Sequence, residues 1–285
     1  MKRLHIKNNH NHTFRRVLAV LLAAAMTFAL AGCSPRELHI GQVEVNTGVN
    51  TAWITPARGV DKFDIPASDF SAGADGSVTY TGTAYRVLQG IDVSTFQQDI
   101  DWQRVAASGV QFAILRAGYR GYTEGSIQED AYFEQNLAGA IDAGLDVGVY
   151  FFSQAMDEQE AREEARFVLD KISGYQLAYP VFFDWEKIGA DARSDAMDLT
   201  SLTTVTDTFC SEIEAAGYQA GLYFNQQLGY EELHLPSLQG YTFWLAEYND
   251  TPSFTYDFDL WQYASDGSVD GIDGDVDLNL AFIGK

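Results

Sequence analysis

Two carboxylates two residues apart end an apolar stretch in the middle of the chain, at Asp184 and Glu186. Side chains alternate between the two faces of a strand, so this spacing places both carboxyl groups on one face and turns Trp185 to the other. Two ionised carboxylates this close repel one another, which raises the pKa of one of them. A protonated acid beside an ionised partner is the arrangement that glycosidic cleavage needs. The pair alone is equally compatible with a solvated strand end or a structural ion pair with an arginine.

Apolar extended runs alternate with amphipathic helices on both sides of this pair. Helical periodicity predicts helices at about 129–143, 157–172 and 201–216. The extended runs are residues 90–94, 112–118, 147–153, 180–186, 220–225, 242–248 and 258–264. This alternation predicts an α/β fold with a mostly parallel sheet. Seven or eight strands favour a single β/α barrel of the TIM type, which need not be regular; an open doubly wound sheet is the alternative.

Polar and aromatic side chains stand at most of the expected strand ends. In β/α barrels the reactive side chains project from the carboxyl ends of the strands, so these residues should share one rim. Carboxylates suit acid–base chemistry, and aromatic faces and amides suit the rings and hydroxyl groups of sugars. Besides Asp184 and Glu186, the candidates at this rim are Asp92, Arg116, Tyr150, Asn225, Glu247, Tyr248, Trp261 and Gln262.

Short blocks at these same places occur in a fixed order along the chain. They are GIDVSTFQ at 90–97, FAILRAGY at 112–119, GVYFFS at 148–153, PVFFDWE at 180–186, WLAEY at 244–248, WQY at 261–263 and VDLN at 276–279. Together they resemble family 25 glycoside hydrolases, the Chalaropsis-type lysozymes of bacteria and phages. The resemblance spans about residues 88–283, which is the whole expected barrel. One departure is Gln98, which stands where many members of that family have glycine.

The resemblance implies roles for four acidic residues. Glu186 matches the general acid/base, and Asp184 matches a partner carboxylate that stabilises the charged anomeric centre or an oxazolinium ion formed by the substrate. Asp92 and Asp277 match a third and a fourth acidic residue of the site. The implied activity is cleavage of the β-1,4 bond between N-acetylmuramic acid and N-acetylglucosamine in peptidoglycan. A non-catalytic peptidoglycan-binding lectin on the same fold is the alternative, and retention of all four carboxylates favours the enzyme.

The first 33 residues resemble a bacterial lipoprotein signal. Residues 1–16 carry five basic and no acidic side chains, and an apolar run at 17–31 leads to Leu30-Ala31-Gly32-Cys33. That run is shorter than the roughly 20 residues that a spanning helix needs. The resemblance implies cleavage before Cys33, a lipid on its thiol, and an extracytoplasmic protein anchored to the bacterial membrane. The expected organisation is therefore a signal peptide at 1–32, a flexible spacer and strand-like lead-in at 33–86, and the catalytic barrel at 87–285.

Charge and cysteine content exclude several other classes of protein. The formal net charge of −22 argues against nucleic acid as a partner, and removing the signal would make the chain more negative still. No pair of histidines has the spacing of metal ligands, so we expect neither a metal nor another cofactor. The aspartates at 270–277 resemble the start of a calcium loop but lack its glycine and its closing glutamate. Cys210 is expected to be a small core residue, and the protein to be a monomer.

Overall fold

The computed structural model describes residues 41–189 and 192–284. Cys33 and the expected signal segment lie outside the described residues. The chain from Gln42 onward forms one compact unit. Within the part of the chain that the structure describes, no helix is long and apolar enough to cross a membrane.

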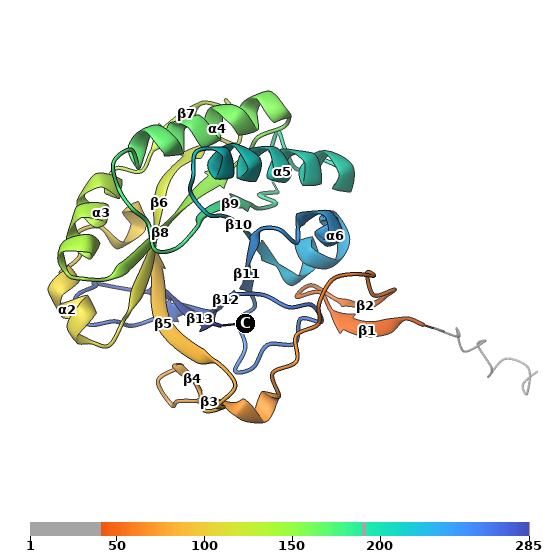
Figure 1. The fold of residues 1–285 in the computed structure, drawn as a ribbon, viewed down its shortest axis with the longest axis horizontal. Coiled ribbons are helices and arrows are strands. Elements are labelled where there is room, and N and C mark those ends of the chain that lie inside the picture. Colours follow the sequence, from red (N-terminus) through yellow and green to blue (C-terminus); the bar gives the residue numbers. More distant parts are fainter. Residues whose placement is uncertain (1–40, 190–191, 285) are drawn as a thin grey trace, which may run out of the picture. The chain divides into compact units, whose positions relative to one another are not determined.

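Eight strands close into a barrel-like sheet, with helices on its outside (Figure 1). Around the ring they are β5 (Arg86–Val93), β6 (Phe112–Arg120), β8 (Asp146–Ser153), β9 (Val181–Trp185), β10 (Ala220–Asn225), β11 (Thr242–Ala246), β12 (Leu260–Gly267) and β13 (Val276–Ile283). The first seven run parallel to one another, whereas β13 is antiparallel to both of its neighbours, β12 and β5. A short strand, β7 (Ile127–Glu129), is added to β6 outside the ring.

The helices cover only part of the barrel. They are α2 (Trp102–Ala107), α3 (Phe133–Asp142), α4 (Glu158–Lys171), α5 (Leu199–Ala215) and the single turn α6 (Leu235–Leu238). Asp157 and Asp198 begin α4 and α5 as N-caps, each accepting a hydrogen bond from a backbone N–H of the first turn. A 3-10 turn, η2 (Thr95–Gln97), follows β5, and a π-helical turn, η3 (Leu228–Glu232), follows β10. Within the described residues, the segments that join β11 to β12 and β12 to β13 contain no helix. The sheet is therefore not a regular eightfold β/α repeat.

Large side chains fill the inside of the barrel. Phe112, Phe182 and Trp244 are almost completely buried there, in a cluster separate from the core under the helices. Glycine makes room for them, because a Cβ on Gly90 would lie only 2.3 Å from the ring of Phe112. This alternation of small and large residues is how a closed barrel of this size fills its interior.

The N-terminal segment covers the side of the barrel that lacks helices. It contains two hairpins, β1 (Val43–Asn46) with β2 (Thr51–Ile54) and β3 (Phe70–Ala72) with β4 (Val78–Tyr80), and a 3-10 turn, η1 (Ala67–Asp69). Phe63 stacks on Phe258 with ring centres 4.5 Å apart, and Phe70 meets Trp261 edge to face at 5.5 Å. The stretch expected as a strand-like lead-in therefore supplies core to the barrel, where aromatic rings replace the missing helices.

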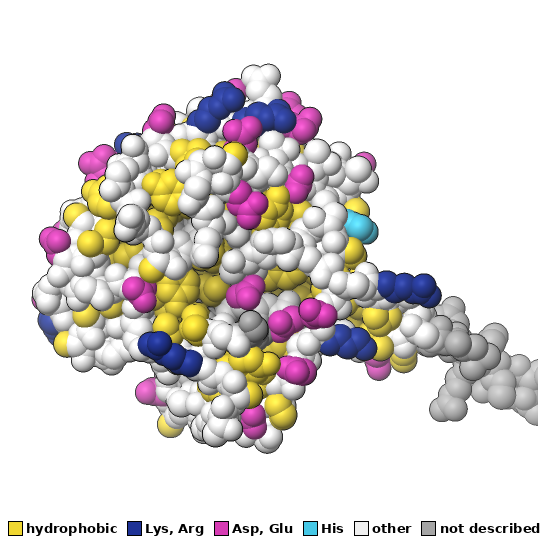
Figure 2. All heavy atoms as spheres, in the orientation of Figure 1, with side chains coloured by type: hydrophobic (Ala, Val, Ile, Leu, Met, Phe, Trp, Pro, Cys, Tyr) yellow, Lys and Arg dark blue, Asp and Glu magenta, His cyan; other side chains and the backbone are white. Residues whose placement is uncertain are grey.

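Most of the predicted elements are present, and they form an α/β fold with an eight-stranded barrel-like sheet that is irregular. The three predicted helices correspond to α3, α4 and α5, and the seven extended runs to β5, β6, β8, β9, β10, β11 and β12. The strand that departs from the parallel pattern is β13, which runs in the opposite direction and forms a hairpin with β12. Figure 2 shows the end of the barrel at which β13 finishes, with hydrophobic and acidic side chains together over its middle.

Candidate active site

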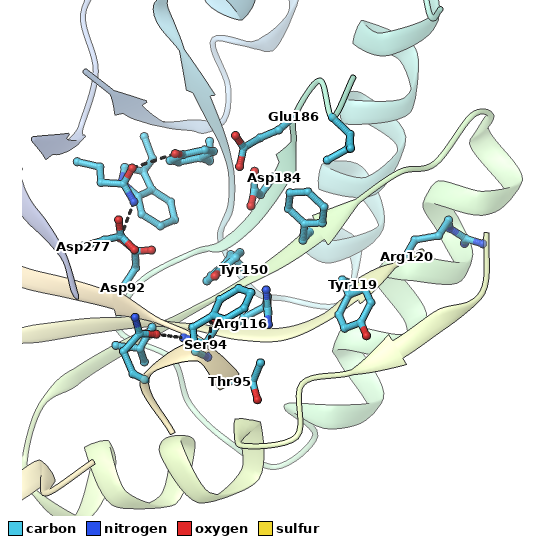
Figure 3. Close-up of a pocket in the computed structure, with 18 of the residues that line it drawn as sticks. Asp92, Ser94, Thr95, Arg116, Tyr119, Arg120, Tyr150, Asp184, Glu186 and Asp277 are labelled. Carbon is cyan, nitrogen blue, oxygen red and sulfur yellow. Dashed lines mark hydrogen bonds between the residues drawn. The ribbon is translucent and has the colours of Figure 1, made fainter. Parts of the chain in front are cut away.

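Asp184 and Glu186 lie at the carboxyl end of β9, on the same side of the strand. Asp184 is the fourth residue of β9 and is 5% exposed, and Glu186 follows directly after the strand ends. Trp185 between them points the other way, into the core under the helices, with 2% of its surface exposed. The alternation expected from the sequence is confirmed, and both carboxyl groups face the cavity at this end of the barrel (Figure 3).

Asp92 and Asp277 face the same cavity from the opposite wall (Figure 3). Asp92 lies near the carboxyl end of β5, and Asp277 lies near the beginning of β13. Because β13 is antiparallel to β5, its beginning meets the carboxyl end of β5, and the two aspartates are paired across the strands. The reversed strand thus brings a residue from the end of the sequence to the rim that carries the other three.

Two amide side chains hold Asp92. Gln262 Nε2 and Asn279 Nδ2 each donate a hydrogen bond of 2.8 Å to Asp92 Oδ2. Trp244 Nε1 donates to Asn279 Oδ1 at 2.8 Å, which fixes the orientation of the Asn279 amide. The hydroxyl of Tyr223 does the same for Gln262 Oε1 at 2.9 Å. The buried carboxyl group of Asp92 is therefore held in place by two amide donors, whose own orientations are fixed by hydrogen bonds.

The cavity between these walls has a volume of about 610 Å³ and is open to solvent on one side. Acidic groups lie at its base, and aromatic rings and two arginines, Arg116 and Arg120, form its sides (Figure 3). Its lining residues are Asp92, Val93, Ser94, Thr95, Phe96, Gln97, Arg116, Tyr119, Arg120, Tyr122, Tyr150, Phe152, Asp184, Glu186, Ile188, Tyr223, Trp244, Tyr248, Gln262 and Asp277. We call this cavity the cleft.

Burial raises the pKa values of the four acidic residues of the cleft. It raises the pKa of Asp92 to about 6, although the hydrogen bonds from Gln262 and Asn279 oppose the shift. Burial, and then the charges of Asp92 and Glu186, raise the pKa of Asp277 to about 8. The pKa values of Asp184 and Glu186 are also raised, first by burial and then by neighbouring carboxylates. Near neutral pH the cleft can therefore hold protonated and ionised carboxyl groups side by side, which general acid catalysis requires.

Arg116 is one of the two arginines that line this acidic cleft. Its Nε donates to Asp130 Oδ2 at 2.8 Å, and Asp130 is buried. Its guanidinium carbon lies 5.2 Å from the ring centre of Phe96 and 5.5 Å from that of Tyr119. The ion pair and the two cation–π contacts fix a positive charge beside aromatic rings, a combination that suits a polar ligand with apolar ring faces.

Eight of the predicted site residues meet in the cleft and three do not. The lining contains Asp92, Arg116, Tyr150, Asp184, Glu186, Tyr248, Gln262 and Asp277. The other three, Asn225, Glu247 and Trp261, lie outside the lining. Asn225 is the last residue of β10 and Glu247 follows the end of β11, whereas Trp261 is the second residue of β12.

Each of these three side chains has a structural role instead. Trp261 points away from the cleft because its neighbour Gln262 points into it, and its Nε1 donates to the backbone oxygen of Glu247 at 2.8 Å. The buried Glu247 carboxylate accepts hydrogen bonds from Asn249, Ser253 and Phe254, and so holds the loop after β11. Asn225 is exposed, and its Oδ1 accepts from the backbone N–H of Leu228 at 3.0 Å.

Sequence reasoning missed several residues that line the cleft or hold one of its carboxyl groups. Asn279 shares a strand face with Asp277, so the period of two could have identified it. Tyr223 lies in the second half of β10 as Tyr150 lies in the second half of β8, and the same signal applies to both. Phe96 lies in the short turn η2 after β5, and Tyr122 lies in a turn after β6, where periodicity gives no signal. Within the described residues no cluster of three or more His, Cys, Asp and Glu side chains has the geometry of a metal site.

Comparison with known proteins assigns this cleft to a family. The model of glycosyl hydrolases family 25 matches residues 91–272, most of the barrel and three of the four acidic residues. The chain belongs to that family. This family 25 chain is therefore a glycoside hydrolase, and its membership accounts for a cleft with several carboxylates at the carboxyl ends of the barrel strands.

Relatives of this family 25 chain cover most of its length. Protein YegX of Escherichia coli O157:H7 is 28% identical over 283 residues, covering 94% of this chain and 91% of YegX. Lysozyme M1 of Streptomyces globisporus is 27% identical over 209 residues, 67% of each chain. Among solved structures, the modular autolysin LytC of Streptococcus pneumoniae in complex with a synthetic peptidoglycan ligand has a TM-score of 0.61 at 23% identity. That match covers 84% of this chain and 56% of LytC, and it supports the fold.

Proposed function

We propose that this chain is a muramidase, which cleaves the β-1,4 bond between N-acetylmuramic acid and N-acetylglucosamine in peptidoglycan. The observation that carries the proposal is the placement of Asp184 and Glu186 on one face of β9, with Asp92 and Asp277 across the same cleft. Family membership supports glycoside hydrolysis, and the similarity to a lysozyme over two thirds of both chains supports peptidoglycan as the substrate.

Glu186 is the general acid/base in this proposal. It lies beyond the end of β9, where its carboxyl group reaches into the cleft and burial raises its pKa. The protonated acid can donate to the oxygen of the leaving sugar, and the resulting carboxylate can then take a proton from water. Asp184 lies deeper, and its Oδ1 has no partner in the structure while being fully buried. Asp184 as a whole lines the cleft, where its carboxyl group is suited to act on the charged centre or the N-acetyl group of the reacting sugar.

Asp92 and Asp277 complete the set. The amides of Gln262 and Asn279 give Asp92 a fixed position, from which its charge acts on the other carboxyl groups. Asp277, with its pKa raised to about 8, is suited to hold a proton that the group shares. Tyr150, Arg116 and Tyr248 line the walls, where they can contact the rings and hydroxyl groups of the glycan.

We further propose that the protein is a monomeric lipoprotein on the extracytoplasmic side of a bacterial membrane. The resemblance of residues 1–33 to a lipoprotein signal supports a lipid on Cys33. Strong net negative charge would repel anionic wall polymers, so a covalent anchor would keep the enzyme near its substrate. Mass spectrometry of the membrane fraction tests this: the native chain should carry the acyl groups, and a Cys33→Ala variant should not.

The first test of the enzyme is digestion of purified peptidoglycan by residues 34–285 and by the same chain with Glu186→Gln. Mass spectrometry of the products should show fragments with reducing-end N-acetylmuramic acid from the native chain, and about a thousandfold less from the variant. Binding of peptidoglycan without release from either chain would support the lectin instead. Equal release from both would show that another group is the acid.

A further inference from the structure

Glu186 lies one residue beyond the last backbone pairing between β8 and β9. The last backbone pair of these strands joins Ser153 to Trp185. One residue further along each strand, the side chain of Gln154 takes over from the backbone: its Nε2 donates to the carbonyl oxygen of Glu186 at 3.1 Å. A side-chain amide thus extends the ladder by one hydrogen bond, to the residue that carries the reactive carboxyl group.

A second buried side chain fixes the orientation of this amide. Ser194 Oγ donates to Gln154 Oε1 at 2.5 Å, which turns the NH₂ group of Gln154 toward Glu186. Gln154 and Ser194 each have 0% of their surface exposed. Water cannot replace these hydrogen bonds at such a site, so the loss of either would leave a polar group unsatisfied.

Arg193 links the pair of Gln154 and Ser194 to helix α4. Arg193, next to Ser194, forms two hydrogen bonds with the carboxylate of Glu160 on α4, at 2.8 and 2.7 Å. Its Nη1 also donates to the backbone oxygen of Gln154 at 3.3 Å. The chain on both sides of the amide is therefore tied to a regular helix rather than to loops alone.

We propose that Gln154 and Ser194 are positioning residues that hold the backbone of Glu186 and so aim its carboxyl group into the cleft. The inference depends on the role of Glu186 in the proposed function. Neither residue lines the cleft, so neither is placed to touch the substrate. Their effect should appear in the chemical step, because displacing a catalytic group by about 1 Å can cost about a hundredfold in rate.

Loss of these hydrogen bonds should change the pKa of the Glu186 carboxyl group. Glu186 faces Asp92 from β5, Asp184 from β9, Asp277 from β13, and the hydroxyl groups of Tyr223 and Tyr248, and burial raises its pKa. A Glu186 released from Gln154 would spend more time toward solvent, where its pKa returns toward the ordinary value. The alkaline limb of the pH–rate profile should then move to lower pH.

The experiment compares Gln154→Leu, Ser194→Ala and the double variant with the native chain. We expect kcat to fall about tenfold to a hundredfold in Gln154→Leu and less in Ser194→Ala, with KM within about twofold of native. The double variant should lose little more than Gln154→Leu, because both changes break one chain of hydrogen bonds. Thr208→Val is the matched control, since it removes a buried hydroxyl bonded to the backbone oxygen of Thr204 on α5, away from Glu186.

The pKa of the Glu186 carboxyl group, measured by NMR in protein with 13C-labelled glutamate, gives a readout that does not need turnover. A lower value in Gln154→Leu and an unchanged value in Thr208→Val would support the proposal. Native kcat and an unchanged Glu186 pKa in a folded Gln154→Leu would overturn it, and Ser194→Ala decides by the same criteria if Gln154→Leu does not fold. If the native chain releases no glycan fragments, the muramidase proposal fails, while the NMR titration still decides the positioning.

Discussion

Asp277 lies directly opposite Asp92 across the antiparallel pair formed by β13 and β5. Burial raises the pKa of Asp277 to about 8 and that of Asp92 to about 6, both above the ordinary value for aspartate. Between about pH 4 and pH 8 the folded chain therefore binds protons at these residues that the unfolded chain has already lost. A group of this kind stabilises the fold at low pH, and its contribution is lost as the pH rises through the folded-state pKa.

Replacing Asp277 by asparagine should remove the part of this pH dependence that Asp277 contributes. The amide of the new side chain stays neutral, so above about pH 8 the variant should melt about 2 to 4 °C higher than the native chain, the effect of about 1 kcal/mol in a chain of this size. Near pH 4 the two should melt together, because Asp277 is then protonated in the folded native chain. Thermal melts across this pH range test the prediction, and a constant difference at every pH would contradict it. Activity should fall at the same time if Asp277 shares the proton of the site.

Gln262→Met should change the ionisation of Asp92. The variant keeps the size of the side chain but removes the donor that lies 2.8 Å from Asp92 Oδ2. Because that hydrogen bond favours the ionised form, its loss should raise the pKa of Asp92 above about 6. We expect kcat to fall about tenfold or more. NMR titration of the aspartate carboxyl groups measures the shift directly, and a pKa that stays the same or falls would show that the amide does not act on Asp92.

Phe96→Ala tests the rim of the cleft. Phe96 is 77% exposed, yet its ring lies against Arg116 and lines the cleft. An exposed ring at this place is suited to stack on a sugar, so its removal should raise KM about threefold to tenfold with kcat nearly unchanged. Steady-state kinetics on soluble glycan fragments separate the two constants. A fall in kcat at constant KM would instead indicate that Phe96 acts by orienting Arg116.

Asn225→Ala tests the correction to the predicted site. Asn225 lies at a strand end but caps the turn that begins at Leu228, outside the cleft. We expect a loss of about 1 kcal/mol in the free energy of unfolding, the usual cost of removing such a cap, and no change in KM. Chemical denaturation and kinetics measure the two effects. A raised KM with native stability would restore Asn225 to the substrate-binding set.

The sequence alone determined the class of fold and the centre of the site. Helical periodicity located α3, α4 and α5, and apolar runs located seven strands, because a residue buried on one side of an element leaves a periodic trace. The alternation at Asp184, Trp185 and Glu186 fixed which side chains face the cavity, since the period of a strand is a local property.

The tertiary structure alone decided how distant segments meet. The sequence placed Asp277 near the last strand, but the reversal of β13 is what sets it opposite Asp92. The sequence likewise could not show that Phe63 and Phe70 cover the side of the barrel without helices. Nor could it show that Ser194 orients Gln154, which then holds Glu186. These relationships join residues far apart in the chain, and they depend on strand direction and closure of the barrel, which no local pattern of residues records.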